Sequence, residues 1–258
     1  ANKILLERNV LRNLGGGGVI LYSGTSDNSI RVNVLRDIAI GGIAVDTLSI
    51  PNPTDQRTVS RRNVVSNNYI TKTGREFPNS EGIFVGLTDG TIVEHNEIAD
   101  LPYSGISVGY AQFIYPSNPI QTQAKNNLIR NNLIRGTMNL LDDGGGIYTG
   151  NVLTGTQISE NYIHSQTRSP WEEGFPNAGI YLDQNTRGVT VKNNVVESTP
   201  LALNLNSACG AFVNFTFTPI RGNTSCSTFT TDSTFNPTAV KSNAGLQSAY
   251  VDIKQIQY

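Results

Sequence analysis

Short runs of alternating apolar and polar residues recur from one end of the chain to the other, and they take two forms. In the first form, an Asn has an aliphatic residue three positions before it and another two positions after it. In the second form, a Gly opens a stretch of the type aliphatic-x-aliphatic, with Thr at the last position in one copy. The first form is centred on Asn9, Asn33, Asn68, Asn96, Asn132, Asn161 and Asn194, and the second begins at Gly18, Gly42, Gly82, Gly105, Gly146 and Gly179, with Ala202 at the equivalent place of a seventh copy.

The apolar residues recur with a period of two, which is typical of β-strands, whereas a helix would repeat them near every 3.6 residues. The shortest interval between consecutive Asn residues of the first form, 24 residues from Asn9 to Asn33, indicates the length of one basic coil. Short strands at a regular interval, with Gly and Asn at the corners, predict an all-β fold, a parallel β-solenoid of about seven to eight coils. Asn suits a corner because it tolerates the left-handed backbone region and its amide can bond to the Asn of the next coil. Gly allows a positive φ or a close approach where a strand begins.

The strands that follow the Gly residues should place two columns of side chains in the interior and one column outside. Consecutive members of a column should lie about 4.8 Å apart, the spacing of neighbouring strands. The first inner column is Val19, Ile43, Ile83, Ile106, Ile147, Ile180 and Leu203, and the second is Leu21, Val45, Val85, Val108, Thr149, Leu182 and Leu205. The outer column is Ile20, Ala44, Phe84, Ser107, Tyr148 and Tyr181.

Four insertions interrupt the repeat, and each adjoins a strand of the Gly form. They span residues 51–60, 73–80, 111–125 and 166–177. We expect them to crowd around one face of the solenoid, and recognition usually resides in such loops on a rigid scaffold.

Aromatic side chains on this face are candidates for contact with a ligand. Tyr148 and Tyr181 should be neighbours on consecutive coils, where their rings suit the apolar faces of sugars. An equally weighted alternative is that the two rings stack on each other merely to cover the sheet, and Trp171 could equally fill a gap in its loop. The residues that we expect to contact a substrate are Phe84, Tyr110, Tyr148, Arg168, Trp171 and Tyr181.

Carboxylates near the same face are candidates for catalysis. Asp143 precedes one Gly strand, Asp183 ends another, and Glu172 and Glu173 lie in the last insertion. An Asp at a strand end commonly caps a turn, so each of these taken alone has a structural explanation. Taken together, carboxylates beside aromatic rings suit glycoside hydrolysis, which commonly uses two of them.

The composition restricts the partners of the chain. Charged residues make up 15% of the sequence and the net charge is −1, so no basic patch for nucleic acid is expected. The sequence has no apolar run long enough to cross a bilayer. Two Cys and two separated His provide no cluster of metal ligands, and we expect neither a metal nor another cofactor. The expected partner is a polysaccharide or oligosaccharide.

Cys209 and Cys226 lie close together near the C-terminus. They could form a bridge in an oxidising compartment or remain two buried thiols; the polar, weakly charged composition favours the bridge and a secreted or extracellular protein. We divide the chain into a solenoid at residues 1–224 and an irregular C-terminal cap at residues 225–258, in which residues 243–253 cover the last coil. The chain begins within the repeat, so we expect an uncapped N-terminal coil, part of a larger chain or assembly, and available for self-association.

The motifs EGIFVG, IRNNLIRGTMNLLDDGGGIYT and AGIYLDQNTRGVTVKNNVV resemble secreted right-handed parallel β-helix proteins of bacteria. They are most similar to the group around glycoside hydrolase family 141, whose members include fucosidases and xylanases. The resemblance covers about residues 60 to 200 and the C-terminal segment. It implies a right-handed β-helix and a carbohydrate-active enzyme, and its acidic motif positions correspond to Asp143 and Asp183. Members of the group carry a long N-terminal portion that this sequence lacks.

The positions of Asp143 and Asp183 in their strands imply a large separation. Asp143 lies three residues before its Gly and Asp183 four after its own, which in extended strands amounts to roughly 23 Å along the strand direction. A glycosidase needs its two carboxyl groups within about 5 to 10 Å. Either the Asp143 segment folds back, or Asp183 pairs with Glu172 or Glu173 from the overlying loop.

Three functions are compatible with these patterns. The first is a carbohydrate-active enzyme, glycoside hydrolase-like, that acts on a plant or microbial polysaccharide. The second is a structural solenoid subunit of an end-to-end fibre or joined assembly, built through the N-terminal sheet edge. The third is a glycan-binding module without catalysis.

Overall fold

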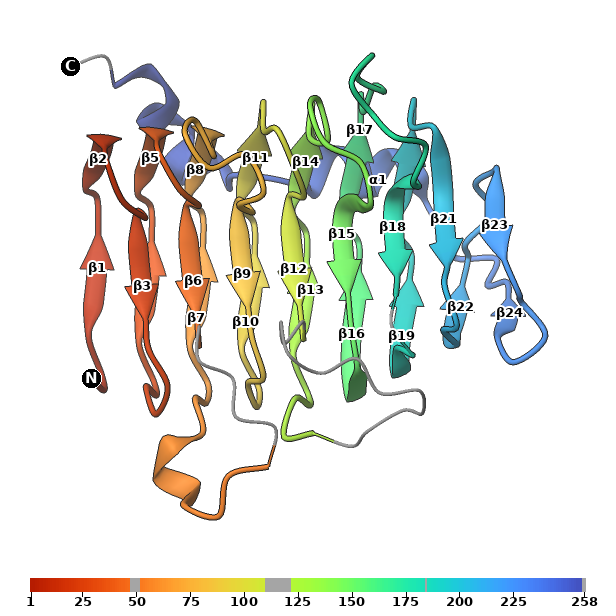
Figure 1. Cartoon of the computed structure of the whole chain (residues 1–258), viewed down its shortest axis with the longest axis horizontal. Helices are drawn as coiled ribbons and strands as arrows, with labels where there is room; N and C mark the ends of the chain where they lie inside the picture. The colour runs from red at the N-terminus through yellow and green to blue at the C-terminus, as the bar shows by residue number, and fades with distance from the viewer. Residues whose placement is uncertain (47–51, 110–121, 184, 257–258) are drawn as a thin grey trace.

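The computed structural model describes residues 1–46, 52–109, 122–183 and 185–256. The chain winds into three parallel sheets stacked as a right-handed β-helix of about 8 coils, as the sequence predicted. The coils follow one another along the rod from the N-terminal to the C-terminal end (Figure 1).

Each full coil contributes one strand to each sheet, so every sheet runs the length of the rod. In spatial order, the first sheet holds β1 (Leu5–Glu7), β4 (Ser29–Arg31), β7 (Val64–Ser66), β10 (Ile92–Glu94), β13 (Leu128–Arg130), β16 (Val152–Ser159), β19 (Arg187–Lys192), β22 (Gly210–Val213) and β24 (Thr228–Thr230). The second holds β2 (Val10–Leu14), β5 (Val34–Ile38), β8 (Tyr69–Thr73), β11 (Glu97–Ala99), β14 (Leu133–Arg135), β17 (Tyr162–His164) and β20 (Val195–Glu197). The third holds β3 (Val19–Leu21), β6 (Ile43–Val45), β9 (Ile83–Val85), β12 (Ile106–Val108), β15 (Gly144–Thr149), β18 (Asn177–Leu182), β21 (Leu201–Leu205) and β23 (Ile220–Gly222).

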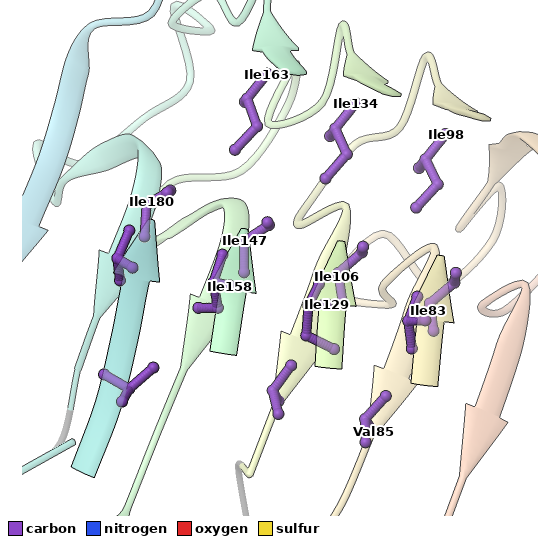
Figure 2. Packing of buried hydrophobic residues seen from close by; sticks show 14 of the residues in the cluster. Ile83, Val85, Ile98, Ile106, Ile129, Ile134, Ile147, Ile158, Ile163 and Ile180 are labelled. Atoms are coloured by element: carbon purple, nitrogen blue, oxygen red, sulfur yellow. The ribbon is translucent and has the colours of Figure 1, made fainter. Parts of the chain in front are cut away.

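Stacked aliphatic side chains fill the interior, and both predicted inner columns are confirmed by the strand register. Figure 2 shows the isoleucines of the third sheet facing those of the other two sheets across the core. The packing leaves Ile83, Ile106, Ile147 and Ile180 without solvent contact.

The predicted Asn column is confirmed as a continuous ladder of seven residues, from Asn9 to Asn194. At each step the backbone N–H and the side-chain amide of one Asn donate to Oδ1 of the Asn on the next coil; for Asn96 and Asn132, both distances are 3.0 Å. The expectation that the ladder Asn residues themselves adopt the left-handed backbone is wrong. The residues in the left-handed region are those just before the ladder positions, namely Arg8, Val32, Asn67, His95, Asn131, Glu160 and Asn193, with φ between 54° and 57°.

A second polar ladder, five residues before the first, was not predicted. The side-chain amide of Asn28 donates to Asn63 Oδ1 at 2.9 Å, and Asn127 Oδ1 accepts from the backbone N–H of Thr91 at 2.8 Å. It could have been found by aligning the copies, because positions 28, 63, 91, 127 and 156 all hold Asn or Thr.

The repeated Gly residues serve close approach between coils, one of the two roles expected for them. A Cβ on Gly105 would lie 2.7 Å from the carbonyl oxygen of Gly146 on the next coil and 2.7 Å from Ile134 Cγ2 in the core. An added Cβ would come similarly close to neighbouring atoms at Gly18, Gly42, Gly82, Gly146 and Gly179. None of the six Gly residues has a positive φ.

The C-terminal segment does not lie over the last coil, and the expectation that residues 243–253 form a cap there is corrected. After α1 (Pro237–Asn243), the chain runs back beside the second sheet to η2 (Ser248–Gln255) (Figure 1). Ile253 packs with Val32 and Val34, and Lys254 Nζ pairs with Glu97 Oε2 at 2.7 Å. The segment packs on apolar side chains of the outer side of the second sheet. This contact was not predicted, because the sequence-based expectation considered only the inward-facing apolar residues.

Cys209 and Cys226 form a disulfide, as expected. The remaining helical element, η1 (Gln56–Thr58), lies in the first insertion. Within the described residues, no helix has the length and apolar character needed to span a membrane.

Candidate functional site

A pocket of about 400 Å³ opens on the outer side of the third sheet, next to β18, β21 and β23. Carboxylates, amides, an arginine and aromatic side chains from separate coils meet in it. Its wall is formed by Asp143, Phe175, Pro176, Tyr181, Asp183, Asn204, Leu205, Asn206, Arg221 and Gly222.

Asp183 follows β18 and is held firmly at the base of this pocket. The residue is 3% exposed. The hydroxyl of Tyr148 donates a hydrogen bond to its Oδ2, and Asn206 Nδ2 donates to its Oδ1 at 2.7 Å. Its backbone N–H donates to the carbonyl of Thr149 at 2.9 Å, while Thr186 closes the turn by donating to its carbonyl oxygen. Both carboxylate oxygens therefore accept hydrogen bonds from uncharged donors, which fix the orientation of the carboxyl group.

Asp143 occupies the turn just before β15, in the left-handed region with φ 57°. Tyr181 donates from its hydroxyl to Asp143 Oδ1 at 3.1 Å, and the hydroxyl of Tyr103 donates to the Asp143 backbone carbonyl at 2.8 Å. The residue keeps solvent contact, but the surrounding wall desolvates its carboxyl. This burial, together with the negative charge of Asp183, raises the pKa of Asp143 above its ordinary value, although the Tyr181 hydrogen bond opposes the rise.

The pairing of the two carboxylates across coils is explained by the tyrosines between them. The ring centroids of Tyr148 and Tyr181 are 5.2 Å apart in an edge-to-face arrangement. Tyr148 extends towards Asp183 of the next coil, whereas Tyr181 extends back to Asp143 of the preceding coil. Both carboxylates line the same pocket. Asp143 lies in a turn with a left-handed backbone, so the estimate from fully extended strands does not apply to it.

The expectation that Tyr148 and Tyr181 form an exposed platform for sugar rings is corrected. Their exposed fractions are 6% and 2%, and they pack with Ala178, so the alternative that the rings cover the sheet describes them better. Burial first, and the charge of Asp183 second, raise the pKa of both phenols. The phenols therefore remain protonated donors to the carboxylates.

The loop at residues 166–177 does not bring Glu172 into the pocket. Its side chain is 3% exposed and is held by Arg168 Nε at 2.7 Å, by the Ser169 N–H at 2.9 Å and by Asn177 Nδ2 at 2.5 Å. Arg168 also donates to the carbonyl of Phe175. Glu172 and Arg168 thus shape the loop, and neither lines the pocket. The burial of Glu172 in its loop argues against its expected catalytic role, whereas the substrate contact expected of the half-exposed Arg168 stays a prediction.

The other residues predicted in this loop lie outside the pocket wall. Glu173 is exposed, and Trp171 is 78% exposed, so Trp171 does not fill a gap in its loop. Phe175 and Pro176 contribute to the wall instead. Asp142 anchors the loop by accepting from the N–H groups of Gly174 and Phe175 at 3.0 and 2.9 Å.

Two further predicted contacts are not part of this pocket as described. Phe84 belongs to the same outer column but lines a separate cavity two coils before Tyr148. Tyr110 lies outside the described residues. In the described part of the chain, no three acidic, His or Cys side chains cluster as a metal site would require.

Asn204, Asn206 and Arg221 are pocket residues that sequence reasoning missed. Asn204 is in register with Tyr181 on one side and Arg221 on the other, and Asn206 directly follows the Leu205 paired with Leu182. The signal was present in the degenerate copy ALNLN, in which alignment on Ala202 places two amides beside Tyr181 and Asp183.

The comparisons with known proteins agree with the fold. Residues 54–246 match the family described as a right-handed β-helix region, and the chain belongs to that family. A solved structure described as a glycoside hydrolase is similar, with a TM-score of 0.80 and 25% sequence identity over 98% of this chain. The chain spans 40% of the length of that structure. Among curated protein sequences, none matches the present chain.

Proposed function

We propose that this member of the right-handed β-helix family is a secreted glycoside hydrolase that acts on a plant or microbial polysaccharide, with Asp143 and Asp183 as its catalytic residues. One observation supports the proposal above all. Two carboxylates of different environment line one pocket: Asp183 is buried and held by two donors, whereas the pKa of Asp143 is raised by burial and by the charge of Asp183. Glycosidases divide acid and base roles between two carboxylates in this way.

Asp143 is the proposed general acid. A raised pKa keeps its carboxyl protonated closer to neutral pH than that of an ordinary Asp. Because Oδ1 accepts from the Tyr181 hydroxyl, the acidic proton resides on Oδ2. Asp143 donates this proton to the glycosidic oxygen as the bond between that oxygen and the anomeric carbon breaks.

Asp183 is the proposed base or nucleophile. It either takes a proton from the water that attacks the anomeric carbon, or attacks that carbon itself to form a glycosyl ester that water then hydrolyses. Tyr148 and Asn206 hold its carboxylate in a fixed orientation during either step. Burial of the Tyr148 phenol lets this hydrogen bond act in a site of low water content.

The remaining pocket residues suit a sugar. Asn204, Asn206 and Arg221 offer amide and guanidinium groups to hydroxyls, and the exposed rings of Phe175 and Trp171 lie in the adjoining loop where an apolar sugar face could rest. The motif correspondence with the glycoside hydrolase family 141 group supports the same assignment.

A screen for released reducing ends on plant and microbial polysaccharides tests the proposal. Asp183→Asn and Asp143→Asn should each lower turnover by a factor of 100 or more, about 3 kcal/mol of transition-state stabilisation. Asp37→Asn is the control. Asp37 has a left-handed backbone with φ 53°, as Asp143 does, but lies in β5 of the second sheet, away from the pocket. Equal turnover by Asp183→Asn and the parent, or no turnover by the parent on any substrate, would refute the proposal.

A structural role is the alternative favoured by the N-terminal coil. β1, β2 and β3 are terminal strands of their sheets. Leu5, the first residue of β1, and Ile4 just before it are 54% and 53% exposed. Such edges can pair with another copy and extend the rod. Electron microscopy of the purified protein distinguishes the two functions, since end-to-end association would give filaments. Binding of glycans without turnover would instead indicate a recognition module.

A further inference from the structure

A second pocket, of about 240 Å³, lies on the third sheet near the N-terminal end of the rod. Its wall is mostly aliphatic and aromatic, with Ile20, Ile40 and Phe84 among its members. Ile20 and Ile40 remain 42% and 38% exposed, so a hydrophobic rim surrounds the opening. Glu81 is the charged residue of this wall. No part of the proposed catalytic mechanism uses this site.

Glu81 gives the apolar pocket a polar anchor. It lies two residues before β9, lines the pocket and keeps some solvent contact. Burial raises its pKa to about 7, although hydrogen bonds from its own backbone and from Ser107 oppose the rise. Such a carboxyl can both accept a hydrogen bond from a hydroxyl and, when protonated, donate one.

The second pocket is aligned with the catalytic pocket along the rod. Phe84 is in register with Ser107, Ser107 with Tyr148, and Tyr148 with Tyr181. Three steps between coils separate Phe84 from Tyr181, or about 14 Å. A glycan lying along the third sheet in the direction of the rod would therefore pass over both pockets.

We propose that this second pocket is a distal subsite that binds a neutral sugar residue of the same glycan chain that the Asp pocket cleaves. The inference rests on the proposed function. An apolar face of the sugar packs on Ile20 and Phe84, and one of its hydroxyls bonds to Glu81. The occupant is a neutral sugar because the carboxyl of Glu81, where ionised, would repel the carboxylate of an acidic one.

The subsite is tested by affinity electrophoresis in gels cast with soluble arabinoxylan, xyloglucan or galactomannan. All proteins carry Asp183→Asn, so that the polysaccharide in the gel stays intact. The parent should be retarded by at least one of these neutral glycans. Ile20→Asn and Glu81→Ala, which removes both the acceptor and the donor, should each raise the dissociation constant measured from the retardation fivefold or more. Ile4→Asn is the matched control, because Ile4 is a 53% exposed isoleucine outside the pocket.

The outcomes separate the subsite from the catalytic proposal. Equal retardation of Ile20→Asn, Glu81→Ala and the parent overturns the subsite, whether or not the wild-type protein cleaves glycans. Failure of all three glycans to retard the parent also overturns it. Selective loss of retardation in the two pocket variants supports the subsite even if the wild-type protein shows no turnover, in which case the catalytic proposal alone fails.

Discussion

The hydroxyl of Tyr181 donates a hydrogen bond to Oδ1 of Asp143 across 3.1 Å, from one coil of the β-helix back to the preceding one. This bond favours the charged form of the carboxyl, whereas burial and the nearby charge of Asp183 favour the neutral form. The neutral form gains more, since the pKa of Asp143 lies above its ordinary value. Tyr181 therefore positions the proposed acid and limits how far its pKa rises.

Replacing Tyr181 by Phe removes the hydrogen bond that lowers the pKa of Asp143. The pKa should rise further, and the alkaline limb of the rate profile, where the acid loses its proton, should move to higher pH. Titration of ¹³C-labelled Asp carboxyls by NMR measures the pKa directly. Tyr162→Phe is the control, because the Tyr162 hydroxyl bonds to Glu197 beside the second sheet. A lower Asp143 pKa in Tyr181→Phe would contradict this account.

The fold was predictable because the coils repeat the same constraints. Stacking Asn96 on Asn132 requires an Asn at the same corner in every coil, and stacking Ile106 on Ile147 requires an aliphatic residue at the same depth. We expected the left-handed backbone at the ladder Asn residues. The structure places it one residue earlier, so the two roles belong to adjacent positions. At Val32, φ is 57° although β-branched residues avoid this region, so geometry imposed by the coil overrides local preference.

Asn96→Ala should cost far more stability than Asn9→Ala. Asn96 has no exposed surface; its Oδ1 accepts from the N–H and the amide of Asn68, and its Nδ2 donates to Val65 and Asn132. Its loss leaves several buried polar groups unsatisfied, so the free energy of unfolding should fall by about 3 to 5 kcal/mol.

Asn9 is the matched site because it begins the ladder on an exposed coil. Its replacement should cost about 1 kcal/mol. Urea unfolding of both variants measures the difference, and equal losses would show that the ladder contributes no more in its interior than at its end.

Gly105→Ala should destabilise the rod strongly, whereas Gly15→Ala should not. A Cβ on Gly105 would lie 2.7 Å from a backbone oxygen of the next coil, which cannot move without separating the coils. A Cβ on Gly15 meets nothing within 4 Å. We expect a loss of about 2 kcal/mol or more for Gly105→Ala, and a change within about 0.5 kcal/mol for Gly15→Ala. Thermal unfolding of the two variants provides the comparison.

The candidate site was less predictable than the fold because it breaks the repeat. Asp143 and Asp183 were found through motifs, but their pairing depends on the tyrosines between them, which no strand-length estimate includes. Glu172 was predicted as a catalytic carboxylate because it lies in the insertion just before β18. Its contacts with Arg168 and Asn177 within its own loop, which depend on loop conformation, remove it from the pocket.

The raised pKa of Glu81 should make the protein less stable as the pH rises. Its pKa in the folded protein is about 7, compared with an ordinary value of 4.5. Between these two pH values the folded state keeps a proton that the unfolded state releases, so this group makes the free energy of unfolding fall as the pH rises. The decrease amounts to about 3 kcal/mol, since each pKa unit corresponds to about 1.4 kcal/mol.

Glu81→Gln removes this titration while retaining the size of the side chain. Urea unfolding at pH 4.5, 6 and 7.5 should show the parent losing stability across the series, and the variant losing about 3 kcal/mol less over the same range. The raised pKa of Asp143 acts in the same direction in both proteins and therefore cancels in the difference. Identical pH dependence in the two proteins would mean that the Glu81 carboxyl titrates normally, as it would if water reached it freely in the second pocket.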